Sequence, residues 1–164
     1  MTTVAPKECL QVGEIFELEL DGSDPKNSPM EMVKQFRPQE VSAWRHKGKV
    51  LPPGRNVGRF MLVRGKNSIT SWQTVHFLEE IYGEHPPGQW LRAFQDKYQV
   101  SLDGVASVSI ADISWICKNG ADCYPSVVVK SGKIGFDNHI NEVDEKECLW
   151  LVFAPAEEQL TPQN

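Results

Sequence analysis

Apolar and acidic residues alternate strictly between Phe16 and Asp21. Phe16, Leu18 and Leu20 share one parity, and acidic residues occupy the positions between and after them. Strand side chains point alternately to the two faces of a sheet, so this segment is predicted to be a strand with one buried face and one solvated face. That arrangement is typical of an antiparallel sheet.

Two other short runs are apolar without alternation. Residues 60–63 and 149–153 contain no polar position. Such runs are typical of strands covered on both faces, and we expect the second run to be a central strand. Residues 125–130 and 133–137 flank a Ser131–Gly132 turn, which predicts a β-hairpin.

The alternation changes parity once between residues 105 and 117. Val108 and Ile110 share one parity, whereas Ile113 and Trp115 share the opposite one. A continuous strand would place the two pairs on opposite faces of the sheet. We therefore predict a bulge or a break near Ala111–Asp112.

Residues 69–102 carry the strongest helical pattern. Apolar side chains recur every three or four positions on both sides of the Pro86–Pro87 pair, which predicts two helices joined by a proline turn. Gly83 follows the first helix, where a residue with positive φ commonly ends a helix. A shorter helix is predicted to begin at Pro29 and to end before Pro38. The expected buried residues of the two main helices are Trp72, Val75, Phe77, Leu78, Ile81, Tyr82, Trp90, Leu91, Phe94 and Tyr98.

These elements predict a single α+β domain over residues 1–154. We expect a mostly antiparallel sheet with the helical hairpin packed on one face, followed by a disordered polar tail over residues 155–164. Residues 39–58 show no periodicity and are interpreted as a long loop with one short strand at residues 49–51. The expected strands lie near residues 13–20, 58–64, 105–117, 125–130, 133–137 and 147–154.

Composition narrows the class of protein. A chain of 164 residues with 40% hydrophobic and 24% charged residues is typical of one soluble globular domain. The sequence has no apolar segment of membrane-spanning length, and its first residues lack the apolar stretch of a signal peptide. We therefore expect a cytoplasmic protein without membrane association. The cysteines are expected to be reduced thiols among apolar residues: Cys9, Cys117, Cys123 and Cys148.

Charge is distributed unevenly along the chain. Residues 34–66 hold nine of the 17 basic residues but only one of the 22 acidic residues, Glu40. A block of one sign either binds a partner of the opposite sign or pairs with charges elsewhere in the same chain. The acidic strand near residues 14–21 is one candidate for such internal pairing.

If the basic segment binds a partner, its cations and one aromatic plane are the expected contacts. The candidate anion- or partner-binding residues are Lys34, Arg37, Trp44, Arg45, Lys47, Lys49, Arg55 and Arg59. The partner would be another macromolecule that offers an acidic protein surface or a nucleic acid. The net charge of −5 disfavours general nucleic-acid binding, because dedicated binders are usually basic.

Candidate chemistry is sparse. Cys117 or Cys123 could meet His139 after folding and act as a nucleophile with its base. Cys117, Cys123, His139 and Cys148 have ligand-type side chains, but their spacing matches none of the short zinc knuckles. We therefore expect no catalytic residue, no metal site and no cofactor.

The sequence thus leaves three functional interpretations open. The first is a non-catalytic interaction protein, such as an adaptor, inhibitor or accessory factor, that binds another macromolecule through residues 34–66. The second is a nucleic-acid-binding accessory protein that uses the same segment. The third is a small enzyme that depends on a cysteine and a histidine. We favour the first, because no catalytic motif occurs in the sequence.

Overall fold

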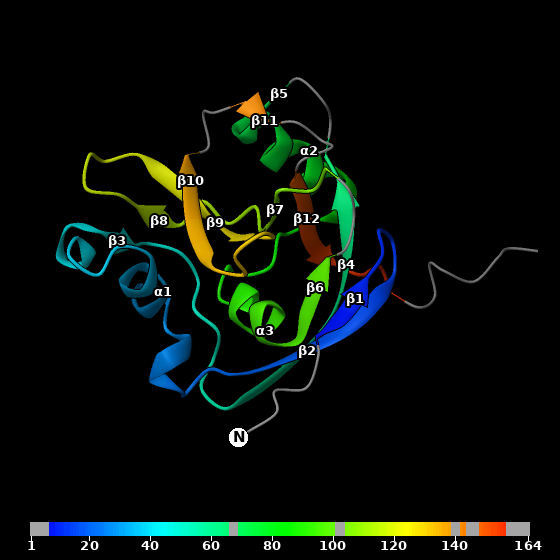
Figure 1. Cartoon of the computed structure of the whole chain (residues 1–164), viewed down its shortest axis with the longest axis horizontal. Coiled ribbons are helices and arrows are strands. Elements are labelled where there is room, and N and C mark those ends of the chain that lie inside the picture. Colours follow the sequence, from blue (N-terminus) through cyan, green and yellow to red (C-terminus); the bar gives the residue numbers. More distant parts are fainter. Residues whose placement is uncertain (1–6, 66–68, 101–103, 139–141, 144–147, 157–164) are drawn as a thin grey trace, which may run out of the picture.

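An eight-stranded mixed sheet forms the centre of the protein, with helices packed against it (Figure 1). The computed structural model describes residues 7–65, 69–100, 104–138, 142–143 and 148–156. From one edge to the other, the sheet contains β2 (Ile15–Asp21), β4 (Arg55–Arg64), β12 (Cys148–Phe153), β7 (Ser107–Ser109), β9 (Asp122–Val128), β8 (Trp115–Ile116) and β3 (Arg45–His46), and β10 (Ile134–Asn138) pairs with β9. The α-helices are α1 (Pro29–Phe36), α2 (Ser71–Tyr82) and α3 (Trp90–Lys97).

Shorter elements lie around this sheet. They are β1 (Glu8–Leu10) paired in parallel with β6 (Tyr98–Val100), β5 (Ile69–Thr70) paired with β11 (Glu142–Val143), and the 3₁₀ turns η1 (Pro25–Asn27) and η2 (Val41–Ala43). Within the main sheet only β12 and β7 pair in parallel among the described strands. The predicted α+β class and the mostly antiparallel sheet are therefore confirmed. Most of the predicted tail, residues 157–164, lies outside the described residues.

The hydrophobic pattern accounts for the strand positions. In β2 the apolar residues are buried and the acidic residues are exposed, as strict alternation predicts. β12 is buried over almost its whole length because its two faces pack in the two core clusters. Its place between β4 and β7 confirms the predicted central strand. β9 and β10 form the predicted hairpin, with Ile134 opposite Val127. No helix in the described ranges combines the length and the apolar character needed to cross a membrane.

The two main helices lie on opposite faces of the sheet, so the predicted placement of a helical hairpin on one face is wrong. Leu149 and Leu151 of β12 belong to the same core cluster as Trp90 of α3, whereas Trp150 belongs to the cluster that contains Leu78 of α2. Neighbouring residues of a strand point to opposite faces. The turn at residues 83–89 therefore carries the chain from one face of the sheet to the other.

Helix α2 also buries less of its surface than its sequence predicts. Val75 and Leu78 are buried, but Trp72 is 48% exposed and Ile81 is 55% exposed. The core cluster beneath α2 is the smaller of the two, and it covers only one stripe of the helix. The helix ends as predicted, with Gly83 at a φ of +80° and its N–H donating to the Glu79 carbonyl.

The predicted break near Ala111–Asp112 is confirmed, and it positions the candidate site. β7 pairs with residues 126–128 of β9, and β8 pairs with residues 122–123 of the same strand. Residues 110–114 leave the sheet between these two pairings. Beside them, β3 pairs with β8 at the sheet edge, so the short strand lies at Arg45–His46 and not at residues 49–51 as predicted. The predicted loop over residues 39–58 is also too long, because β4 begins at Arg55.

Candidate functional site

The cations predicted from the sequence fall into two groups. Lys34 and Arg37 lie at the end of α1, and Arg45 lies in β3, which contacts α1. Arg55 and Arg59 lie in β4, near the opposite edge of the sheet. The eight candidate residues therefore do not form one continuous surface.

Three of these cations pair with carboxylates of the same chain. The pairs are Lys47 with Asp122 at 2.9 Å, Lys49 with Glu84 at 2.7 Å, and Arg55 with Glu19 at 2.5 Å. The hydrogen bond from Arg55 lowers the pKa of the Glu19 carboxyl, and the bond from Lys49 does the same for Glu84. The pairs are exposed, so solvent screens them and they add little to stability. Internal pairing thus accounts for part of the charge block, including the expected pairing with the acidic strand β2.

Trp44 is not available as a stacking plane. Its side chain is buried, and its ring lies 6.3 Å from the ring of Phe36 and 5.3 Å from that of Phe136. An indole packed between aromatic side chains has no exposed face on which a base could stack. The sequence pattern Trp-Arg-His-Lys therefore contains one core residue, two exposed cations and a partly buried histidine.

A cavity of about 480 Å³ lies where the sheet is interrupted. Its volume falls within the range of small-molecule sites. Its walls combine apolar side chains with a few polar groups, as such sites commonly do. The lining residues are Gly48, Lys49, Val50, Leu51, Pro52, Glu84, His85, Pro87, Asp112, Ser114 and Phe153.

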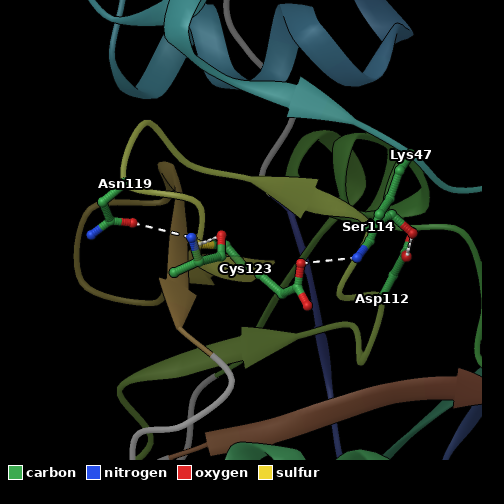
Figure 2. A network of polar contacts seen from close by, with 7 residues as sticks. Lys47, Asp112, Ser114, Asn119 and Cys123 are labelled. Carbon is green, nitrogen blue, oxygen red and sulfur yellow. Dashed lines mark hydrogen bonds and ion pairs between the residues drawn. The ribbon is translucent and has the colours of Figure 1, made fainter.

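Asp112 is the central polar residue of this cavity. It is 3% exposed, its Oδ2 accepts the backbone N–H of Gly88 at 2.7 Å, and its Oδ1 accepts the hydroxyl of Ser114. Figure 2 shows the bond between Ser114 and Asp112, with Lys47 beside them. His85 Nε2 lies 4.0 Å from Asp112 Oδ1, beyond hydrogen-bonding distance. The carboxylate is therefore held by neutral donors.

The lack of a side chain at Gly48 allows the backbone there to pack directly against Ser114. A β-carbon at Gly48 would lie 1.9 Å from Ser114 Oγ and 3.6 Å from His46 Nε2. The Lys47 N–H also donates to the Ser114 carbonyl at 2.9 Å. Residues 46–48 and Ser114 are thus in direct contact, although they are far apart in the sequence.

His46 is a partly buried neighbour of this cluster. Its ring lies 4.5 Å from the ring of Trp115, and its Nε2 has no hydrogen-bond partner among the described residues. Burial lowers the pKa of the His46 imidazole, and the charge of Asp112 opposes that shift. The neutral form is therefore favoured in the folded protein.

Acidification is expected to destabilise the protein through His46. The folded pKa lies below the ordinary value of 6.5, so the unfolded chain takes up a proton at higher pH than the folded chain does. The stability that His46 contributes is complete above pH 6.5, and it falls as the pH drops from 6.5 to the folded pKa. Urea unfolding between about pH 7.5 and pH 5.5 measures the slope. His46→Gln should show a shallower slope, and identical slopes would contradict this role.

The polar cluster does not form a nucleophile–base pair. Ser114 donates to the Asp112 carboxylate, whereas a catalytic serine donates to a histidine that the acid orients. Within the described ranges, no group of three or more His, Cys, Asp or Glu residues could hold a metal ion. The Ser114 hydroxyl is therefore not arranged as the nucleophile of a serine–histidine pair.

The thiols differ in burial and reactivity. Burial, with a smaller contribution from the neighbouring Cys117, raises the pKa of the Cys123 thiol to about 12, so this thiol is a poor nucleophile at neutral pH. Cys117 donates to the Asn119 side chain. Figure 2 shows Asn119 and Cys123 as parts of one network of polar contacts. Cys9 is exposed, contrary to the expectation of apolar surroundings, because it lies in the peripheral strand β1. His139, the expected base, lies outside the described residues.

Sequence reasoning did not identify the cavity. His85 lies in the proline turn, yet its side chain is only 28% exposed and lies 4.0 Å from Asp112. The parity change at residues 110–113 was the available signal, because a break in a sheet leaves polar side chains free to line a site. No protein-family model matches this chain, and comparisons with curated proteins and with solved structures also give no match.

Proposed function

We propose that this protein is a non-catalytic interaction protein that binds an acidic surface of another macromolecule. The binding surface is the basic end, defined as Lys34, Arg37, Arg45, Lys47 and Lys118. One observation carries the proposal. Lys34, Arg37 and Arg45 are exposed, and none of them forms an ion pair with a described residue.

Contacts within the fold support a shared surface. Helix α1 touches both η2 and β3, and β3 is the edge strand of the sheet (Figure 1). Lys118 reaches Glu40 at 3.2 Å, which brings the β8–β9 turn to the same end. The basic end therefore combines five cations with two carboxylates, Asp122 paired with Lys47 and Glu40 paired with Lys118.

This mixture of charges favours a protein partner over a nucleic acid. A phosphate backbone requires cations along its track, and each contact releases counterions. The carboxylates of Glu40 and Asp122 interrupt such a track, whereas a protein surface offers both signs and can match them. A nucleic-acid partner remains the alternative proposal.

The cytoplasm is the proposed location of the protein. A reducing compartment of this kind would keep the four cysteines free.

Charge reversal at the basic end should weaken partner binding without unfolding the protein. The variant is Lys34→Glu with Arg45→Glu, and the probes are fluorescein-labelled polyglutamate and a labelled DNA duplex. Each exposed pair contributes about 0–1 kcal/mol, and reversal replaces attraction with repulsion, so polyglutamate affinity should fall about tenfold. Fluorescence anisotropy measures the affinity, and a thermal melt measures stability.

Arg64→Glu is the matched control. Arg64 belongs to the same basic segment but ends β4, away from β3. Its reversal changes the net charge without touching the basic end, so it should leave polyglutamate binding nearly unchanged. Equal weakening by Arg64→Glu and by the double variant would show a general charge effect and contradict the proposal. Preferential DNA binding, with a salt slope of about 0.9 per phosphate contact, would favour the nucleic-acid alternative.

A further inference from the structure

The cavity at Asp112 is a second candidate site, and it adjoins the basic end at Lys47. We infer that it binds a small primary amine, with the ammonium group at Asp112 and an apolar body against the cavity walls. The inference rests on three features of the cavity: its hydrogen-bond acceptors, its charge and its apolar lining. It goes beyond the macromolecular binding proposed above and does not depend on it.

Three groups that can act as acceptors, on Asp112, Ser114 and His85, line the same part of the cavity. Asp112 Oδ1 already accepts the Ser114 hydroxyl and has a further lone pair. The Ser114 oxygen donates its only proton to Asp112 and keeps its own lone pairs for a ligand. His85 Nε2 lies 4.0 Å from Asp112 Oδ1, so a nitrogen about 2.8 Å from each atom can donate to both when the imidazole is neutral with its proton on Nδ1. Three acceptors match the three N–H donors of an ammonium group.

The charge of the site favours a cation. A carboxylate as buried as that of Asp112 is normally paired with a cation or held by several donors. Here the two donors are neutral, and the nearest group that can become cationic is His85. The ammonium of Lys49 is held at the rim by Glu84 at 2.7 Å, and its side chain is 81% exposed. No lysine or arginine of the described chain therefore pairs with Asp112.

The remaining walls suit an apolar body. Val50, Leu51, Pro52, Pro87 and Phe153 line the cavity, whose volume of about 480 Å³ exceeds that of an aromatic side chain. The wall at Leu51 is fixed, because the Leu51 N–H donates at 2.9 Å to Gln89 Oε1 and Gln89 is 1% exposed. A ligand with a flat aromatic or branched aliphatic body fits this lining.

The test compares tryptamine with its neutral alcohol analogue, tryptophol, on the full chain. Tryptamine is expected to bind, and tryptophol is expected to bind at least about tenfold more weakly because it cannot supply a charged donor. In ¹⁵N-resolved NMR titrations, tryptamine should shift the amides of Gly48, Gly88 and Ser114. Equal binding of both compounds, or tryptamine shifts elsewhere, would overturn the inference.

Variants test the assignment to Asp112. Asp112→Asn keeps the shape of the side chain and removes its charge, so tryptamine affinity should fall at least about tenfold. Asp96→Asn is the matched control, because it removes an exposed carboxylate of α3 that does not line the cavity, and it should bind as the unmodified protein does. If Asp112→Asn does not fold, Ser114→Ala removes one acceptor and should weaken binding severalfold. Unchanged affinity in the folded variants would contradict the site.

A final arm separates a free amine from a lysine of a partner chain, since both carry an ammonium. An acetylated Gly-Lys-Gly amide presents lysine as a partner would, without an aromatic body. It is expected to bind much more weakly than tryptamine, because it leaves the apolar walls uncovered. Equal or tighter binding of the peptide would overturn the small-molecule assignment.

Discussion

Replacing Trp115 with alanine is expected to lower the free energy of unfolding by about 3–5 kcal/mol. Trp115 is fully buried, and its ring lies 4.5 Å from His46 and 5.3 Å from Phe136. Its Nε1–H also donates to the Pro29 carbonyl at 3.1 Å, and truncation would leave that carbonyl unpaired. Gly88 packs so closely that a β-carbon there would lie 2.5 Å from the Trp115 ring. Urea denaturation monitored by circular dichroism measures the loss.

Trp115→Phe separates the contribution of the packed ring from that of the hydrogen bond to Pro29. Phenylalanine keeps much of the aromatic volume but cannot donate to Pro29, so its loss should be clearly smaller than that of alanine. A denaturation midpoint that Trp115→Ala leaves unchanged would show that this ring is not part of the core. A loss of equal size in both variants would place most of the effect in the hydrogen bond.

Trp90→Ala is expected to cost a similar amount, about 3–5 kcal/mol. Trp90 begins α3, is 3% exposed, and packs with its ring 4.9 Å from that of Phe60 in β4. Its removal opens a void between the helix and the sheet, which the rigid strands cannot fill. Chemical denaturation monitored by circular dichroism again measures the change.

Trp72→Ala is the matched control for Trp90. Trp72 is 48% exposed on α2 and contacts the ring of His76 at 4.1 Å. Because truncation there removes little buried area, the change should stay within about 0.5 kcal/mol. Comparable losses at both tryptophans would mean that exposure does not rank these side chains correctly.

The same two tryptophans show what a local pattern can predict. Both lie at helical spacing beside other apolar residues, yet only Trp90 is buried. Burial depends on what faces the helix, and the clusters beneath α2 and α3 are built from strands far away in the sequence. Periodicity therefore predicts that a helix has an apolar face but not how much of that face is covered.

Strand properties were more local and were predicted better. The alternation from Phe16 to Leu20 requires only neighbouring residues, and the parity change near Ala111–Asp112 correctly predicted a break. The cavity instead depends on contacts between distant segments, such as Gly48 with Ser114 and His85 with Asp112. Ion pairs such as Lys49 with Glu84 depend on the fold in the same way. The excess of basic residues in the sequence therefore does not distinguish cations that pair within the chain from cations that bind a partner.

The position of β12 in the sheet constrains the order of assembly during synthesis. β12 is the last strand of the main sheet in the sequence, yet it lies between β4 and β7. Until residues 148–153 leave the ribosome, the β2–β4 pair and the strands around β9 cannot join, and each presents an unpaired edge. Such edges are sites of aggregation in incomplete chains. A nascent chain that stops before β12 therefore holds two incomplete half-sheets, and a short C-terminal segment converts them into one core.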